Sequence, residues 1–415
     1  MLDIAAIVLF VTVIAQLIQE RFRVPASITV VLIGLGVKLL GFGGIIASDY
    51  VFDQIILVLL PILLTVDVLH LHWKDIKRHA ASLFYAAGIS VALAILAGLL
   101  VVNMMLPGYE LSVASIVILM CMVTATDPCS VSAIFSTQKV PKDLKIIAEG
   151  ESCFNDATAL VIFSLALVVE KSTTDISILE MSKIASSVVF GAIAIGTLVG
   201  FLGLVLMKLT KNAYIETSIM LLSAFSSFAI AEHFHFSGIL AIIVSVMLAN
   251  TVVLSRITRD EEIIDSGQAK KSVYVDKANH ESLYKFIQLL AMFGVTIMFL
   301  TLADSVSFES LIKYWKEILS VFVISTIIRI IVFAKFALVS NMFSKMQSIS
   351  FSWYKILVFG GVKGCLSLIM LHLIPDSMTY KPLFEAIVMG VILLTTFIYP
   401  IIMVSVIKVY GDKLK

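Results

Sequence analysis

The sequence predicts an all-α polytopic membrane protein with about thirteen transmembrane helices. Three observations support this fold class. Of the 415 residues, 60% are hydrophobic and only 14% are charged, and the mean hydropathy is +1.05, far above that of soluble domains. The apolar residues form runs of roughly 17–25 residues or longer, the length at which a helix crosses a bilayer. The charged residues lie in short segments between these runs, and we find no soluble domain.

The predicted spans follow one another along almost the entire chain. They cover residues 2–19, 25–42, 50–69, 79–105, 111–137, 144–170, 183–209, 213–232, 236–254, 283–304, 314–341, 351–374 and 380–409. The first is interpreted as a mature helix, because no basic region precedes it and no small-residue cleavage site follows it. We expect one membrane domain over 1–409, a tail over 410–415, and a charged cytoplasmic segment over 255–282 that forms a loop or a short amphipathic helix.

Lysine and arginine are distributed unevenly between alternate loops, and this predicts the orientation. The basic-rich loops and the C-terminus hold Arg21, Arg23, Lys74, Lys77, Arg78, Lys139, Lys142, Lys145, Lys208, Lys211, Arg256, Arg259, Lys270, Lys271, Lys277, Lys345, Lys408, Lys413 and Lys415. The other loops hold only Lys171, Lys183, Lys313, Lys316 and Lys381. With an odd number of spans, this bias places the N-terminus outside a cell membrane and the C-terminus in the cytoplasm. The net charge of +1 says nothing about nucleic-acid or acidic partners, because the charges are few and lie in short loops, and we expect no nucleic-acid partner.

A carboxylate lies in the middle of the fifth span, where a charge costs at least ~2.5–3.5 kcal/mol. Asp127 is followed by Pro128, which cannot donate a backbone hydrogen bond and disfavours helical backbone at the residue before it. We therefore predict a break in this helix, with freed backbone groups that line a polar cavity. Thr126 adds a hydroxyl beside the break.

The sixth span carries a polar stripe. Helical geometry puts Ser152 and Asp156 four residues apart on one face, and Glu151 and Asn155 form the neighbouring row. Hydroxyl, amide and carboxylate oxygens form a hard ligand shell that suits an alkali cation, whereas a zinc or copper site would require His and Cys. The candidate ligands in the fifth and sixth spans are Asp156, Asp127, Ser152, Asn155 and Thr126.

The twelfth span contains an unusual density of glycine for mid-membrane, at Gly360, Gly361 and Gly364 around Lys363. If the chain consists of two inverted six-helix repeats joined by the seventh span, the fifth and twelfth spans correspond. Two discontinuous helices that cross at the midplane are typical of a secondary transporter, although glycine also permits close helix packing. Lys363 and Arg329 lie too deep to reach the interface, so each requires a buried carboxylate or a polar cavity.

These segments resemble the signature of the monovalent cation/proton antiporter-1 family, the sodium/proton antiporters of NhaP and NHE type. The motifs that carry the resemblance are Thr126-Asp127-Pro128 with Val131 and Ala133-Ile134-Phe135, Glu149-Gly150-Glu151-Ser152 with Phe154-Asn155-Asp156, Leu60-Pro61-Ile62-Leu63-Leu64, Ala231-Glu232, Ser237-Gly238-Ile239-Leu240-Ala241 and the segment from Gly360 to Ser367. The resemblance covers essentially the whole membrane chain. It implies a homodimer in which core helices over 79–170 and 314–409 move in an elevator-like manner against dimerisation helices over 1–69 and 183–304.

The resemblance also implies roles for individual residues. Asp156 binds either the cation or the proton, and Asp127, Ser152 and Thr126 complete the Na+ site. The neutral Asn155 implies electroneutral exchange, one cation for one proton. Glu151 forms a supporting ion pair with Arg329. Such exchange requires no cofactor, because the ions are the substrates, and we find no phosphate-binding loop and no enzyme motif.

Two positions depart from the family pattern. Val66, with Asp67 beside it, stands where family members often carry Glu, and Lys363 stands where they carry Arg. Lysine keeps a positive charge that balances the carbonyl ends of half-helices, but it lacks the bidentate geometry of arginine and can deprotonate when buried. The part of Lys363 in coupling therefore stays open.

Other functions remain as alternatives. The expected cation is Na+, with Li+ as a second candidate, and a K+/H+ antiporter of the same fold is possible because K+ accepts the same ligands. A cation channel is another alternative, and it would conduct the cation without coupling to protons. An intramembrane aspartyl protease also uses two buried Asp residues, but Asp127 and Asp156 both lack the Gly-x-Gly-Asp context that it requires.

Overall fold

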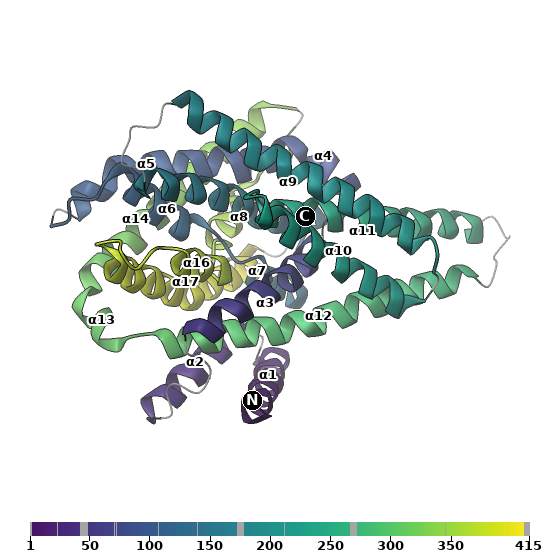
Figure 1. Cartoon of the computed structure of the whole chain (residues 1–415), viewed down its shortest axis with the longest axis horizontal. Coiled ribbons are helices and arrows are strands. Elements are labelled where there is room, and N and C mark those ends of the chain that lie inside the picture. The colour runs from purple at the N-terminus through teal and green to yellow at the C-terminus, as the bar shows by residue number, and fades with distance from the viewer. Residues whose placement is uncertain are drawn as a thin grey trace. The chain divides into compact units, whose positions relative to one another are not determined.

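The computed structural model describes residues 2–22, 24–41, 49–69, 71, 73–106, 108–138, 140–171, 178–210, 212–265, 272–344 and 346–410. Within these residues every regular element is a helix (Figure 1). The helices are α1 (Leu2–Phe22), α2 (Ala26–Leu39), α3 (Asp49–Leu69), α4 (Trp73–Phe84), the π-helix η1 (Tyr85–Ile89), α5 (Ser90–Met105), α6 (Val113–Thr124), α7 (Pro128–Thr137), α8 (Lys142–Lys171), α9 (Ile178–Met207), α10 (Ala213–His233), α11 (Gly238–Asp265), α12 (Ser272–Ser305), α13 (Phe308–Lys313), α14 (Trp315–Met342), α15 (Phe351–Phe359), α16 (Cys365–His372) and α17 (Lys381–Tyr410).

Eight helical stretches in the described residues are long and apolar enough to cross a membrane. They are Ala5–Phe22, Trp73–Met104, Lys142–Glu170, Leu179–Met207, Tyr214–His233, Tyr284–Ser305, Trp315–Met342 and Lys381–Tyr410. The other predicted spans contain shorter apolar helices or a pair of helices separated by a break. The prediction of an all-helical membrane protein is confirmed, whereas the number of thirteen spans stays a prediction.

The two predicted breaks are present. In the fifth predicted span, α6 ends at Thr124, residues 125–127 are not helical, and α7 begins at Pro128. In the twelfth, α15 ends at Phe359 and α16 begins at Cys365, with the glycine-rich segment between them. Each broken helix starts from a serine whose hydroxyl accepts a backbone N–H of the first turn, Ser112 for α6 and Ser350 for α15. Both breaks therefore interrupt helices with well-defined starts.

The charged segment predicted as a loop or a short amphipathic helix, 255–282, differs from that expectation. Helix α11 continues through it to Asp265, α12 begins at Ser272, and residues 266–271 lie outside the described part. Glu, Lys and Arg are good helix formers, so charge by itself does not end a helix. Likewise, the fourth predicted span begins earlier, at Trp73, because α4 is an amphipathic helix that runs directly into η1 and α5. Of the tail, residues 411–415 lie outside the described part.

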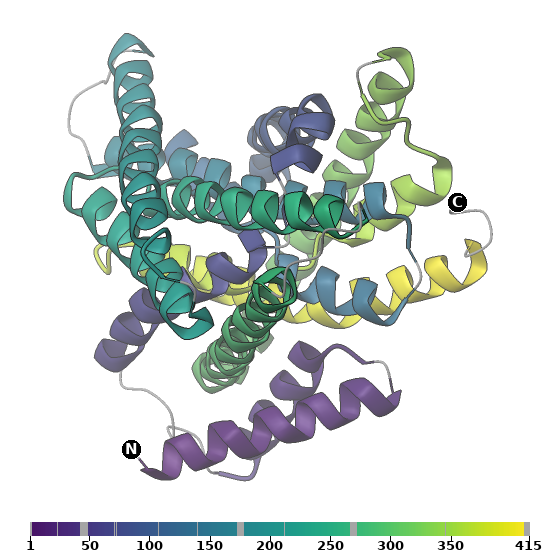
Figure 2. The ribbon, with the colours of Figure 1, turned by 90° about the vertical axis from the view of Figure 1, so that its right-hand side faces the viewer.

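The chain divides into two compact units. The first comprises Met1–Asp53, Ile76–Met181 and Val295–Lys415, and the second comprises Gln54–Asp75 and Ser182–Gly294. Within the first unit α1 and α2 pack side by side (Figure 2), and both broken helices pack against α17. Within the second unit α10 packs on α11 and glycines of α9 lie against α11, where a Cβ on Gly196 would lie 2.6 Å from the Ala241 carbonyl oxygen. All the residues of the predicted site belong to the first unit, whereas Val66 and Asp67, where the sequence departs from the family pattern, belong to the second.

Candidate functional site

The two helix breaks touch each other. The Asp127 N–H donates to the Val362 carbonyl oxygen over 2.7 Å, so the freed backbone of one break is bonded by the other. A Cβ on Gly364 would lie 2.5 Å from the Asp127 Cβ, which leaves no room for any residue but glycine. The glycine-rich sequence and the Asp-Pro sequence, far apart in the chain, therefore form one contact.

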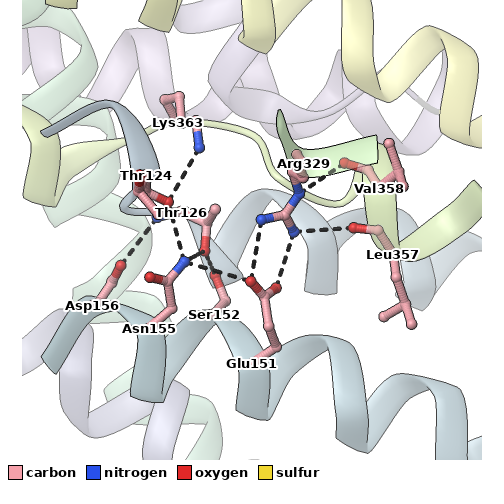
Figure 3. Close-up of polar contacts among 10 residues, drawn as sticks. All are labelled: Thr124, Thr126, Glu151, Ser152, Asn155, Asp156, Arg329, Leu357, Val358 and Lys363. Atoms are coloured by element: carbon pink, nitrogen blue, oxygen red, sulfur yellow. Dashed lines mark hydrogen bonds and ion pairs between the residues drawn. The ribbon is translucent and has the colours of Figure 1, made fainter. Parts of the chain in front are cut away.

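Asp156 of α8 lies against the first break. The Thr126 N–H, freed from the helix by the break, donates to Asp156 Oδ1 over 3.1 Å, and the Thr126 and Ser152 hydroxyls are 2.7 Å apart (Figure 3). Asp156 is only 5% exposed, and Thr126 and Ser152 are buried. A carboxylate and two hydroxyl oxygens thus gather at a point where backbone groups are not used by a helix.

Asn155 lies beside them on α8. Its amide nitrogen donates to the Thr124 carbonyl oxygen at 3.1 Å, to the Thr126 hydroxyl at 3.3 Å and to Glu151 Oε1 at 3.5 Å. Because all three neighbours are oxygen atoms, the amide nitrogen rather than the amide oxygen faces them. In the flipped amide, Asn155 Oδ1 would face these three oxygens instead. Asn155 therefore ties α8 to the last carbonyl of α6.

Asp127 forms the N-terminal cap of α7. Its Oδ2 accepts the Ser130 N–H over 3.3 Å and also accepts the Ser130 hydroxyl, with Pro128 at the first helical position. Asp at the cap and Pro next to it is a favourable start for a helix. The Ser130 hydroxyl in turn lies 3.3 Å from that of Ser27 on α2. Asp127 is 7% exposed, so its charge is buried as the sequence predicted.

Glu151 and Arg329 form a buried, bidentate ion pair, with 3.2 Å from Nη1 to Oε1 and 3.1 Å from Nη2 to Oε2. The same guanidinium donates to the Val358 and Leu357 carbonyls at the end of α15, at 2.9 and 3.0 Å. Such bidentate, charge-assisted bonds are among the strongest in proteins. Arg329 therefore compensates both a buried carboxylate and the carbonyl end of a half-helix.

Lys363 compensates the carbonyl end of the other half-helix, α6, as Arg329 does for α15. Its side chain is 4% exposed, and its ammonium donates to the Thr124 carbonyl oxygen at the end of α6 over 3.2 Å (Figure 3). A cation is favoured at the C-terminus of a helix, where unbonded carbonyls concentrate negative potential. The Lys363 N–H donates to the Thr395 hydroxyl of α17 over 3.2 Å, which fixes the backbone of the break.

The structure thus brings together Thr126, Ser152, Asn155 and Asp156, and it places Asp127, Lys363 and the Glu151–Arg329 pair directly around them. Asp67 is a buried residue of α3 in the second unit. Two participants were missed from the sequence: the Thr124 carbonyl, which accepts both Asn155 and Lys363, and Ser27. A hydroxyl in the first turn of the mostly apolar α2 was the available signal for Ser27.

The comparison with protein families decides the identity. The family model described as sodium/hydrogen exchanger, transmembrane, matches residues 6–409. The chain belongs to this sodium/hydrogen exchanger family. The resemblance predicted from the motifs is therefore confirmed, and so is the prediction of a transporter rather than an enzyme, for which the ions are substrates and no cofactor is needed.

Individual relatives of this exchanger match over nearly its whole length. The Na+/H+ antiporter ApNhaP of Aphanothece halophytica is 25% identical over 413 residues, 99% of this chain and 74% of that protein. The low-affinity Na+/H+ antiporter NhaS1 of Synechocystis is 23% identical over 409 residues, 96% of this chain and 72% of that protein. Among solved structures, the sodium proton antiporter MjNhaP1 from Methanocaldococcus jannaschii has a TM-score of 0.75 at 18% identity, over 99% of this chain and 97% of that one. This structural likeness supports the same fold.

Proposed function

We propose that this exchanger moves one Na+ in one direction for one proton in the other, at a site centred on Asp156. The observation that carries the proposal is the buried Asp156 carboxylate, bonded by the freed Thr126 N–H beside the Thr126 and Ser152 hydroxyls. These are hard oxygen ligands of the kind that an alkali cation takes. Asp127 and Asn155 contribute directly or through water, and the Glu151–Arg329 pair holds α8 to α14 and α15.

Competition at one carboxylate is sufficient for coupling. Burial penalises the bare charge of Asp156, so the group is neutralised either by a proton or by a cation, but not by both. If the core helices move only when Asp156 is neutralised, each cation carried one way is matched by a proton carried the other way. Asn155 adds no second titrating carboxylate, which supports electroneutral 1:1 exchange.

The proposal includes the assembly and the orientation. The protein works as a homodimer in the cell membrane, with the N-terminus outside and the C-terminus in the cytoplasm, as the distribution of Lys and Arg favours. Core helices over 79–170 and 314–409 move in an elevator-like manner against dimerisation helices over 1–69 and 183–304. This assignment rests on the family resemblance; the two broken helices lie in one compact unit, which also contains residues 1–53 of the proposed dimerisation helices.

Reconstitution into liposomes that contain a pH-sensitive dye tests the proposal. Addition of Na+ should dissipate a preformed proton gradient, Asp156→Asn should abolish the response, and Asp376→Asn should leave it unchanged. Asp376 is a suitable control because its side chain is 97% exposed and pairs with Lys381 in a loop. Full activity of Asp156→Asn would remove Asp156 from the site.

The same assay separates the second candidate function, K+/H+ exchange by the same fold. Similar oxygen shells bind Na+, Li+ and K+, so each cation is added in turn to the same vesicles. A response to K+ alone would replace Na+ as the substrate, and a response to none of the three would contradict antiport altogether.

A further inference from the structure

A small cavity borders Asn155 of α8, Ala86 of the π-helix and Ser90, which follows the π-helix. It has a volume of about 30 Å³ and is bordered by Asn155, Lys363, Ser90, Glu151, Arg329 and Ser325, among others. A polar cavity of this size holds a water molecule, provided that the water finds two to four polar partners.

Two residues that border this cavity have a buried side-chain oxygen without a hydrogen-bond partner among the described residues: Asn155 at Oδ1 and Ser90 at Oγ. Asn155 is 1% exposed and Ser90 is 4% exposed, so bulk solvent does not supply the missing bonds. A buried polar group left without a hydrogen bond costs about 1–3 kcal/mol, so two at one small cavity call for a bound polar ligand.

In the described helices, the Ser90, Ser367 and Thr396 hydroxyls are buried without a hydrogen-bond partner, and of these three residues Ser90 borders the cavity. Thr12, Thr158 and Ser164 bond back to the carbonyl four residues earlier, as hydroxyls in helices commonly do. Ser90 instead follows the π-helix, where its N–H reaches the Tyr85 carbonyl five residues earlier. Single π-turns inside α-helices occur frequently at functional sites, and here one precedes a serine that borders the cavity.

Lys363 supplies a complementary donor. Its ammonium carries three N–H groups, and the hydrogen bond that the structure gives it goes to the Thr124 carbonyl. A water molecule can accept one N–H from Lys363 and donate its two hydrogens to Asn155 Oδ1 and Ser90 Oγ. A cation fits less well, because the cavity wall carries two basic side chains, Lys363 and Arg329, against the single carboxylate of Glu151.

We propose that this cavity is a site for one ordered water, bound by Ser90, Asn155 and Lys363. The water gives the buried ammonium a second partner and holds the Asn155 amide in the orientation that presents its nitrogen to Thr124 and Thr126. Ser90 is thus a positioning residue that acts on the ion site through water. The functional part of this proposal rests on the proposed ion exchange, whereas the water site itself does not.

High-resolution cryo-electron microscopy of the protein in lipid nanodiscs tests the site directly. In the wild type, a density peak should lie within hydrogen-bond distance of Ser90 Oγ, Asn155 Oδ1 and Lys363 Nζ, equally in Na+ and in choline buffer. Ser90→Ala should abolish the peak, and Ser90→Thr, which keeps the hydroxyl, should retain it. The matched control is Ser325→Ala at the same cavity, whose hydroxyl is already bonded to the Phe322 carbonyl at 3.0 Å; it should leave the peak in place.

Three results would overturn the water site. The first is an empty cavity in a wild-type map that shows other buried waters, and the second is a peak that persists in Ser90→Ala. The third is a peak that appears only with Na+, which would make the occupant a cation. In the liposome assay, Ser90→Ala should raise the KM for the cation about threefold to tenfold, since one or two weak bonds are lost. Ser90→Thr and Ser325→Ala should match the wild type. Unchanged KM in Ser90→Ala would remove the positioning role, and a wild type that shows the water but exchanges no cation would contradict only the proposed function.

Discussion

At the scale of single residues, two basic side chains support the site without being ligands. Lys363 bonds the last carbonyl of α6, and Arg329 bonds the last carbonyls of α15. Each is therefore a cation at the C-terminus of a half-helix, where the helix dipole and the freed carbonyls favour positive charge. Arginine suits α15 because it bonds two carbonyls and a carboxylate at once, whereas the single carbonyl of Thr124 needs only the point charge of a lysine.

The buried pair of Glu151 and Arg329 gives the first prediction. Arg329→Leu should destabilise the folded protein by about 3–5 kcal/mol, because it leaves the Glu151 carboxylate buried and uncompensated. The double variant Glu151→Leu/Arg329→Leu should be less destabilised than Arg329→Leu alone. Thermal unfolding of Arg329→Leu, Glu151→Leu and the double variant in detergent measures this coupling, and strictly additive losses would show that the two charges do not depend on each other.

At the scale of elements, Asp127 has two separable properties, a cap for α7 and a buried charge. Asp127→Asn should change stability by less than about 0.5 kcal/mol, because Asn caps a helix as well as Asp does. It should nevertheless raise the KM for the cation on the order of tenfold, since the charge is lost. Asp127→Ala should lose the cap as well, at about 1 kcal/mol. Equal stability of the Asn and Ala variants would exclude the capping role.

The contact between the two breaks gives the third prediction. Gly364→Ala should abolish exchange, because the new Cβ would lie 2.5 Å from the Asp127 Cβ and push the breaks apart. The control is Gly36→Ala in α2, where a Cβ would meet no atom within 4 Å and should stabilise the helix by up to about 1 kcal/mol. Exchange activity and unfolding temperature are measured for both. Wild-type exchange by Gly364→Ala would show that the breaks need not touch.

The sequence was sufficient to predict the two breaks and, from the assumed inverted repeats, that the broken helices cross, but not the bonds that join them. Pro128 and the glycines around Lys363 act locally, so each marks a place where a helix stops. The bond from Asp127 N–H to the Val362 carbonyl depends on tertiary packing, which no local rule reports. The π-helix at Tyr85–Ile89 was equally hidden, because its residues are apolar and continue an ordinary span. Element ends were wrong where charged residues continue a helix, as in α11 and α12.

At the scale of the whole molecule, the site depends on a single unit that contains both broken helices, α8 and α14. The core helices of this unit can carry a neutralised Asp156 together, because the ligands, their supporting charges and the freed backbone groups are bonded to one another. If one cation replaces one proton, no net charge crosses the membrane, and the rate of exchange should not depend on the membrane potential. Clamping the potential with K+ and valinomycin should leave the Na+-driven rate unchanged, and a rate that follows the potential would contradict 1:1 stoichiometry.

The central claim is that a cation and a proton compete for Asp156, and the pH dependence of the KM for Na+ tests it most directly. The rate of exchange in proteoliposomes is measured over a range of Na+ concentrations at several pH values, equal on both sides of the membrane. In the acidic range, where the carboxyl is protonated, the KM for Na+ should rise about tenfold for each unit of lower pH, while the maximal rate stays the same. A KM that does not change with pH, with a maximal rate that falls instead, would contradict competition at one site.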